Sequence, residues 1–124
     1  MRIVRIEIEY KRYFIRYEVH SSGNNSILNK NMRETDFIAR FGGEEFVSIL
    51  PATDIKAAQL VTDKLRELIA TSNFHFREEA VKITVSAGFA EVKDNEDGEN
   101  LFIRADKALY KAKESGRNNC QPAS

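Results

Sequence analysis

The sequence predicts an α+β domain in which helices pack against a mostly antiparallel sheet. Three observations support this fold class: short runs of alternating apolar residues, two longer segments with helical spacing, and a glycine pair between two short apolar runs. The expected order of elements is β-α-β-β-α-β-α, which gives a sheet with helices packed against it. At 124 residues the chain is long enough to bury one core, so we expect a single domain over residues 1–124.

The amino-acid composition restricts the binding partners and the cellular location that we expect for this chain. The 19 basic and 19 acidic residues balance, so the chain has no net field that would attract nucleic acid or an anionic membrane. No apolar run approaches membrane-spanning length, and nothing at the start reads as a signal peptide. The single cysteine, Cys120, cannot form an internal disulfide. Together these features predict a cytoplasmic protein.

The front part of the chain is predicted to contain one strand, a loop and a short helix. Apolar and charged side chains alternate along Arg2–Tyr10, as in a strand with one buried face. Residues 21–25 read Ser-Ser-Gly-Asn-Asn, a composition typical of a loop. Residues 27–34 would make only a short helix.

A tight hairpin is predicted around Gly42 and Gly43, because the pair separates two short apolar runs at residues 36–41 and 45–50. Glycine tolerates positive φ and lets a ligand approach the backbone closely. Glu44 and Glu45 follow directly, and carboxylates at a hairpin tip can bind a cation such as Mg²⁺. Taken alone, the four residues would favour an ordinary turn with solvated acids.

Two later segments have the spacing of amphipathic helices. Pro51 ends the second hairpin strand, and Thr53 or Asp54 can cap the first helix. The second helix covers residues 101–115, with Gly116 as its C′ residue. The residues expected to face the core are Ile55, Ala58, Val61, Leu65, Leu68 and Ile69 in the first helix, and Leu101, Ala105, Ala108, Leu109 and Ala112 in the second.

Strands are also expected between these helices. Residues 74–77 form a possible small edge strand. Residues 81–92 alternate, and a polar, acidic loop follows at residues 93–98. The side chains expected on one face of this strand are Val81, Ile83, Val85, Ala87 and Phe89.

Three motifs, in order and with matching spacing, resemble the GGDEF family of diguanylate cyclases. They are the Gly-Gly-Glu-Glu-Phe hairpin at residues 42–46, a T-x-S-x-G strand at residues 84–88, and an A-D-x-A-L-Y-x-A-K-x-x-G-R-N segment at residues 105–118. The resemblance covers residues 33–119, and residues 1–32 are a divergent or truncated front part. It implies the ferredoxin-like, polymerase-palm type of sheet seen in nucleotidyl cyclases.

The resemblance also implies an activity. A diguanylate cyclase condenses two GTP molecules into cyclic di-GMP and two pyrophosphates with Mg²⁺ or Mn²⁺, and metal ions and positioning carry most of such chemistry. Each domain of this kind holds one GTP, so the working form would be a homodimer.

By the family pattern, Glu44 would bind the metal, and Glu45 would be a second ligand or handle the hydroxyl proton. Gly42 and Gly43 would let the nucleotide lie against the hairpin backbone. Lys113 and Arg117 would bracket the phosphates; in isolation that pair would instead read as a cation at a helix C-terminus and a solvated arginine. 

The front part departs from the family pattern D-x-D-x-F-K-x-x-N-D-x-x-G-H-x-x-G-D. Anchored on His20 and Gly23, the pattern places Glu7 and Glu9 at the metal-binding carboxylates, and Glu7 becomes the second metal ligand. Ile15 takes the place of a guanine-binding asparagine, and Asn24 takes the place of an aspartate. We therefore expect weak binding of GTP.

Arg33 and Asp36 form an R-x-x-D sequence that ends five residues before Gly42. This is the spacing of the family's inhibitory site, where arginine and aspartate bind cyclic di-GMP. A guanidinium can form paired hydrogen bonds with a phosphate or a guanine edge. The alternative for an isolated R-x-x-D is a surface salt bridge.

Three functions follow from these motifs. The preferred one is a diguanylate cyclase weakened by its altered guanine site. The second is an inactive domain that acts as a cyclic di-GMP receptor through Arg33 and Asp36. The third is a folded fragment with neither role.

Overall fold

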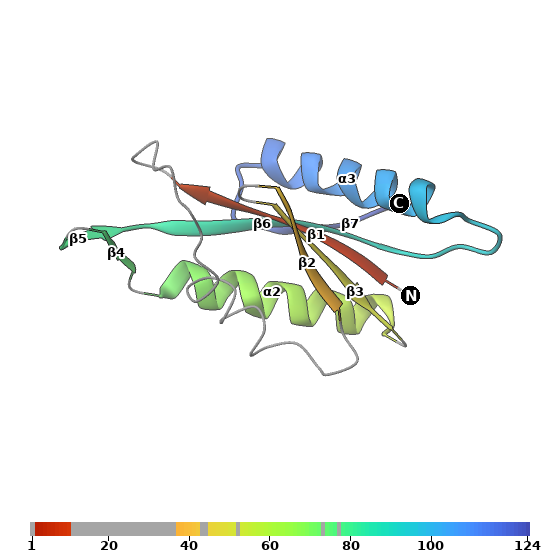
Figure 1. The fold of residues 1–124 in the computed structure, drawn as a ribbon, viewed down its shortest axis with the longest axis horizontal. Helices are drawn as coiled ribbons and strands as arrows, with labels where there is room; N and C mark the ends of the chain where they lie inside the picture. The colour runs from red at the N-terminus through yellow and green to blue at the C-terminus, as the bar shows by residue number, and fades with distance from the viewer. Residues whose placement is uncertain (1, 11–36, 43–44, 52, 73, 77) are drawn as a thin grey trace.

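The computed structural model describes residues 2–10, 37–42, 45–51, 53–72, 74–76 and 78–124. In this part of the chain, five strands form one sheet in the order β2-β3-β1-β6-β7. Helices α2 (Ile55–Thr71) and α3 (Gly98–Glu114) cover its opposite faces (Figure 1). The strands are β1 (Arg2–Tyr10), β2 (Phe37–Gly42), β3 (Glu45–Leu50), β6 (Ile83–Glu91) and β7 (Cys120–Pro122), and a separate two-stranded sheet contains β4 (Phe74–Phe76) and β5 (Glu79–Val81).

The main sheet is mixed. Strand β3 pairs antiparallel with both β2 and β1, and β1 pairs antiparallel with β6. Strand β7 runs parallel to β6, because helix α3 carries the chain back along the sheet before β7 begins. The sequence predicted neither β7 nor this parallel pair, which is an exception within the mostly antiparallel sheet that the sequence predicts.

The predicted hairpin is confirmed. Strands β2 and β3 pair antiparallel, with Arg40 opposite Phe46 and Gly42 opposite Glu45. The register shifts between Arg40 and Gly42, which marks a local irregularity of the kind called a β-bulge. The hairpin lies next to β1, as the alternation of β1 led us to expect.

Both helices begin at an aspartate cap. Asp54 Oδ1 accepts a hydrogen bond from the Ala57 amide at 2.8 Å, which selects Asp54 over Thr53 as the cap of α2. Asp97 Oδ1 accepts from the Asn100 amide at 2.7 Å, so α3 begins at Gly98, three residues earlier than expected. The five side chains expected to face the core from α3 are all buried.

The buried stripe of α2 differs from the expected one at two positions. Ala58, Leu65 and Ile69 are buried as expected, but Leu68 is 39% exposed. Thr62 is buried instead, and its hydroxyl donates to the Ala58 carbonyl oxygen at 2.6 Å. That hydrogen bond satisfies the polar group inside the helix, so a threonine can occupy the core-facing stripe.

Strand β6 is buried on both faces rather than one. Residues 83–90 are all buried, including Thr84 and Ser86 on the face that does not carry Ile83 and Val85. The strand begins at Ile83, two residues later than expected: Val81 belongs to β5, and Lys82 lies between the two strands. Since α2 and α3 cover both sides of the central strands, apolar alternation identified only one of the two buried faces.

Gly88 sets how closely α3 packs on the sheet. A Cβ atom at this position would lie 2.1 Å from the Leu109 nitrogen and 2.4 Å from the Ala105 carbonyl oxygen. Both are backbone atoms of α3, so the helix could not accommodate a side chain without moving. The glycine of the T-x-S-x-G motif thus has a packing role.

The core has one cluster on each face of the sheet. Phe46 and Leu50 of β3 pack towards α2, together with Leu65 and Ile69. The intervening residues Val47 and Ile49 pack on the other side, with Leu101 and Ala105 of α3. Residues of β3 therefore alternate between the two helices.

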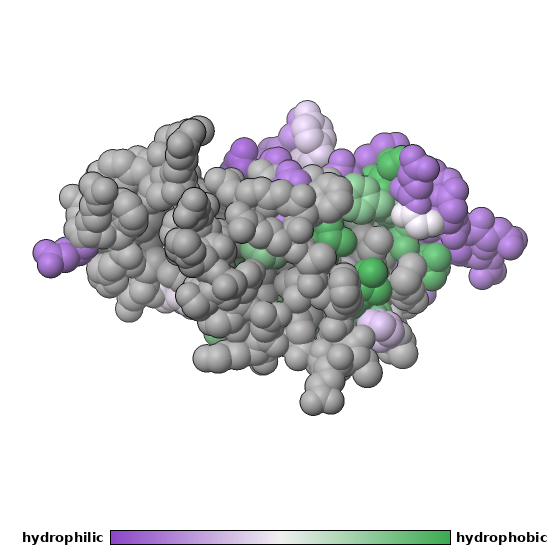
Figure 2. All heavy atoms as spheres, in the orientation of Figure 1, coloured by the Kyte–Doolittle hydropathy of each residue, from purple (hydrophilic) through white to green (hydrophobic). Residues whose placement is uncertain are grey.

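Figure 2 shows hydrophilic side chains gathered at one end of the molecule, where residues 92–97 connect β6 to α3. Lys93, Asp94, Asn95 and Asp97 in this connection are exposed. The C-terminus of α3, with Lys113, lies at the opposite end of a 17-residue helix, about 25 Å away. This acidic connection is therefore distant from the predicted phosphate-binding residues.

Candidate functional site

The described part of the hairpin places one of its two carboxylates. Glu45 is the first residue of β3 and is half-buried. Every second side chain of a strand points to the same face of the sheet, so Glu45 shares its face with Val47 and Ile49, which pack with α3. Glu45 thus lies on the α3 side of the sheet. Gly43 and Glu44 lie outside the described residues.

The register of the sheet brings three segments into one row. Glu45 of β3 lies opposite Glu7 of β1, and Glu7 lies opposite Ser86 of β6. Neighbouring strands are about 4.8 Å apart, so this row crosses about 10 Å of sheet. The hairpin, the first strand and the T-x-S-x-G strand meet at this level. The expected pairing of Glu7 with Glu44 stays a prediction.

The chain leaves α3 through a turn with three successive residues at positive φ. Gly116, Arg117 and Asn118 have φ values of 107°, 64° and 49°. The Gly116 amide donates to the Lys113 carbonyl oxygen at 3.3 Å, and the Arg117 amide donates to the Ala112 carbonyl oxygen at 3.1 Å. These two bonds form a Schellman motif, which confirms Gly116 as the C′ residue.

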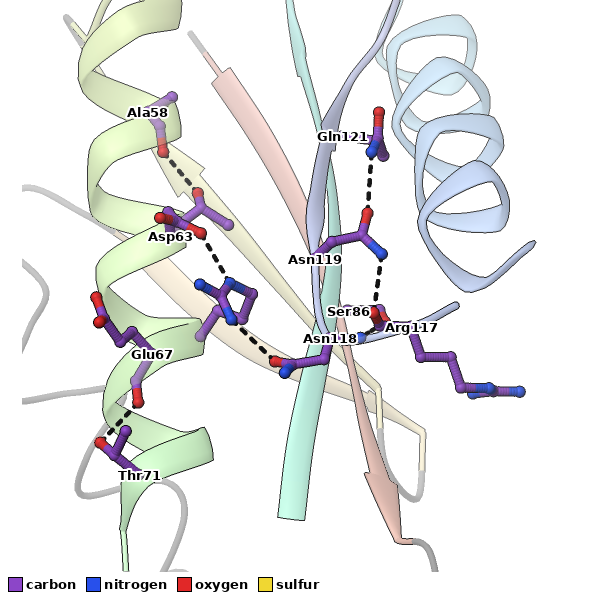
Figure 3. A network of polar contacts seen from close by, with 11 residues as sticks. Ala58, Asp63, Glu67, Thr71, Ser86, Arg117, Asn118, Asn119 and Gln121 are labelled. Atoms are coloured by element: carbon purple, nitrogen blue, oxygen red, sulfur yellow. Dashed lines mark hydrogen bonds and ion pairs between the residues drawn. The ribbon is translucent and has the colours of Figure 1, made fainter. Parts of the chain in front are cut away.

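Further hydrogen bonds fix this turn against the sheet (Figure 3). The Asn118 amide donates to Ser86 Oγ at 3.1 Å, and the Ala87 amide donates to the Asn119 carbonyl oxygen at 3.0 Å. The side-chain amide of Asn119 donates to the carbonyl oxygens of Ala112 at 2.7 Å and Arg117 at 3.0 Å. Because Ser86 belongs to the row that contains Glu7 and Glu45, the turn lies at the level of these two residues in the sheet.

The two predicted phosphate-binding residues lie at this end of α3. Lys113 is in the last turn of the helix and is half-buried, whereas Arg117 is exposed. Figure 3 shows the Arg117 side chain extending away from α2 and from the contacts around Asn118. Lys113 and Arg117 thus lie at the end of α3 whose following turn is bonded to Ser86, a residue of the row described above.

Several predicted site residues cannot be placed. Residues 11–36 lie outside the described ranges, and with them Ile15, His20 and Gly23. The same holds for the predicted guanine contact Asn24 and the R-x-x-D pair Arg33 and Asp36. Among the residues that the structure describes, no group of three or more His, Cys, Asp or Glu side chains is arranged to hold a metal ion.

Sequence reasoning missed the residues that hold the turn. In the sequence, Ser86 and Asn118 stand out only as members of motifs, and no local pattern marks Arg66 of α2. Arg66 Nη1 donates to Asn118 Oδ1 at 3.0 Å, across 52 positions of sequence. The run of polar residues after Gly116 was the available signal, since such side chains often bond to nearby backbone.

Cys120 begins β7 and packs against the core cluster beneath α2. Burial raises the pKa of its thiol to about 12, so the thiol stays protonated near neutral pH. A protonated thiol is a poor nucleophile.

Neither α2 nor α3 is long and apolar enough to cross a membrane, and the described residues contain no other helix.

Comparison with known proteins identifies relatives for most of the chain. The family model for "Diguanylate cyclase, GGDEF domain" matches residues 24–119. The diguanylate cyclase DgcP of Pseudomonas aeruginosa is 51% identical over 96 residues, which cover 77% of this chain and 14% of that protein. Diguanylate cyclase A of Treponema denticola is 30% identical over 125 residues, which cover 95% of this chain and 34% of that protein.

The fold also resembles a solved structure. The crystal structure of the GGDEF domain of DgcB from Caulobacter crescentus, in complex with c-di-GMP, superimposes with a TM-score of 0.82 at 30% sequence identity. The match covers 98% of this chain and 77% of that one. The chain thus spans most of a solved domain but only 14% and 34% of the two curated relatives.

Proposed function

This chain belongs to the GGDEF family, and we propose that it is a diguanylate cyclase domain that condenses two GTP molecules into cyclic di-GMP and two pyrophosphates. The observation that carries the proposal is the register that aligns Glu45, Glu7 and Ser86, with the turn containing Arg117 bonded to Ser86. Residues far apart in the sequence thereby share one level of the sheet. The antiparallel pairs among β2, β3, β1 and β6 support a palm-type arrangement.

The row of carboxylates suits a divalent cation. Glu7 and Glu45 lie opposite each other on neighbouring strands, and we propose that the cation binds beside this pair of residues. In the proposed site Glu7 and Glu44 hold Mg²⁺ or Mn²⁺, for which carboxylate oxygens are suitable ligands. The bound ion would supply charge neutralisation at the phosphates. Glu45 would be a further ligand or accept the 3′-hydroxyl proton.

The remaining residues would position the nucleotide. Lys113 and Arg117 bind the phosphates, and Gly42 and Gly43 allow the nucleotide to lie along the hairpin backbone. Each domain presents one GTP, so the 3′-hydroxyl of one nucleotide attacks the α-phosphate of the other within a homodimer. Asn24 replaces a carboxylate in the guanine site, and we therefore expect weak GTP binding and slow turnover.

Incubation with GTP and Mg²⁺, followed by chromatography for cyclic di-GMP, tests this proposal. We expect slow product formation by the wild-type chain and none by Glu45→Gln. Glu99→Gln is the matched control, because Glu99 is an exposed carboxylate in the first turn of α3, remote from the row. Absence of product from the wild type, or equal rates for all three proteins, would overturn the cyclase assignment.

A second function is supported by the R-x-x-D sequence and by the cyclic di-GMP complex of the Caulobacter domain. Here Arg33 and Asp36 would bind cyclic di-GMP whether or not the chain makes it. Calorimetry should show binding to the wild type, and Arg33→Ala should weaken it by about 1.5–3 kcal/mol, the range for hydrogen bonds to charged groups. Glu44→Gln should leave binding unchanged, because Glu44 belongs to the hairpin. No heat from the wild type excludes the receptor function.

A further inference from the structure

A hydrogen bond joins α2 to the turn after α3. Arg66 Nη1 donates to Asn118 Oδ1 at 3.0 Å, and Arg66 Nε donates to Asp63 Oδ1 at 2.7 Å. The Arg66 side chain is 20% exposed and that of Asp63 is 54% exposed. Helix α2 contains none of the three family motifs, yet it reaches the G-R-N turn through this pair.

Asp63 holds the Arg66 guanidinium in a fixed orientation. The two residues are three positions apart on one helix face, where such pairs meet. The hydrogen bond from Arg66 to Asp63 also raises the pKa of Arg66, a guanidinium that is charged in any case. With its Nε bonded to Asp63, the planar guanidinium presents Nη1 to Asn118 as a charged donor.

The turn needs such support because of its backbone conformation. Arg117 and Asn118 have positive φ, at 64° and 49°, a region that residues other than glycine, asparagine and aspartate rarely adopt, so the cost falls mainly on Arg117. The backbone amide of Asn118 is bonded to Ser86 and its side-chain oxygen to Arg66, so the residue is held at two points. Loss of the Arg66 contact would remove one of these restraints, and the turn would then sample more favourable right-handed conformations.

The direction of Arg117 depends on that turn. The Arg117 amide donates a hydrogen bond to the Ala112 carbonyl oxygen, and the next residue in the chain is Asn118. A change of φ at either residue would swing the guanidinium away from its present direction, shown in Figure 3. A phosphate contact needs that direction to be kept, because bidentate geometry is specific.

We propose that Arg66 is a positioning residue that acts through Asn118 to hold Arg117 in the direction required for phosphate binding, with Asp63 orienting Arg66. The inference rests on the proposed function for the role of Arg117, but the effect of Arg66 on the turn can be measured separately. It adds α2 to the elements that build the site.

The first measurement is the backbone conformation of the turn by NMR. Three-bond HN–Hα coupling constants of Arg117 and Asn118 report φ, and Arg66→Ala should shift both away from their wild-type values. Asn118→Ala should do the same, whereas Asn118→Asp, which keeps an acceptor for Arg66 and tolerates positive φ, should resemble the wild type. Lys64→Ala is the control, because Lys64 is an exposed cation on α2. Unchanged couplings in Arg66→Ala would overturn the inference, and if that variant fails to fold, Asn118→Ala gives the same test.

The second measurement is GTP affinity by calorimetry on Arg66→Ala, Arg117→Ala and the double variant. We expect each single change to weaken binding on the order of tenfold, as loss of one hydrogen bond to a charged group would. The double variant should bind no more weakly than Arg117→Ala alone, because Arg66 acts through Arg117. Additive losses would overturn the positioning role. Shifted couplings in Arg66→Ala together with unchanged affinity in Arg117→Ala would support the effect on the turn and contradict the proposed phosphate contact.

Discussion

At the level of single residues, Gly88 determines the distance between α3 and the sheet. Gly88→Ala would place a Cβ atom 2.1 Å from the Leu109 nitrogen, and a backbone atom cannot yield as a flexible side chain does. We expect the free energy of unfolding to fall by about 3 kcal/mol, the upper part of the usual range for overpacked cores.

Urea denaturation checks this prediction, with Gly98→Ala as a matched control. An added Cβ at Gly98 has no atom within 4 Å, and Gly98 is the first residue of α3. Alanine there should be neutral or slightly stabilising, since glycine is the weaker helix former. Equal urea midpoints for the two variants would contradict the close-packing role of Gly88.

Cys120 gives the protein a predictable response to alkaline pH. Burial raises the pKa of its thiol from 9.0 to about 12, so the folded protein keeps a proton that the unfolded chain loses. Between about pH 9 and pH 12 the unfolded state therefore binds fewer protons than the folded state, and the free energy of unfolding falls as pH rises. Cys120→Ala should remove this part of the pH dependence. The midpoint of thermal unfolding at pH 7 and pH 10, measured for both proteins, provides the test, and parallel changes would contradict it.

The sequence predicts the motif residues of the candidate site better than the residues that hold them in place. Glu45, Lys113 and Arg117 were named because they belong to segments with a recognisable pattern. Arg66 was not, because its contact with Asn118 joins residues 52 positions apart and depends on how α2 packs. Local patterns carry no information about such a pair.

At the level of elements, the caps account for where the helices begin. Asp54 accepts a hydrogen bond from the Ala57 amide, and Asp54→Ala would leave that amide without the side-chain acceptor. We expect a loss of about 1 kcal/mol in the free energy of unfolding, while Asp54→Asn should lose much less, because asparagine is also a good cap. Chemical denaturation of the three proteins measures this. An equal loss in both variants would show that charge, rather than the hydrogen bond, stabilises the helix start.

The elements themselves were predictable to different degrees. The hairpin and the buried stripe of α3 have strong local signals, namely a glycine pair between apolar runs and five core residues at helical spacing. Strand β7 has only three residues, which is too short for a sequence pattern. It is a strand because it pairs with β6 after α3 has brought the chain back along the sheet. The buried Thr62 was missed for a related reason, since its hydroxyl is satisfied by Ala58 within the folded helix.

At the level of the whole molecule, the order of strands in the sheet determines which residues of the candidate site are neighbours. Strand β1 lies between β3 and β6, so residues near positions 7, 45 and 86 become neighbours although they are far apart in sequence. The alternation in β1 predicted a strand beside the hairpin, but alternation does not specify register. The row that joins Glu45 to Ser86 required the folded structure.

The last prediction concerns assembly, since a single domain with one bound GTP cannot complete a product that joins two. In the proposed mechanism two domains meet face to face, so the rate of cyclic di-GMP formation per domain should rise with protein concentration until the homodimer is saturated. Initial rates over a dilution series, compared with sedimentation at the same concentrations, measure this dependence. Adding excess Glu45→Gln should lower the rate per wild-type domain, because mixed dimers contain one impaired site, whereas Glu99→Gln should not. A rate per domain that stays constant where sedimentation shows only monomers would contradict the dimer mechanism.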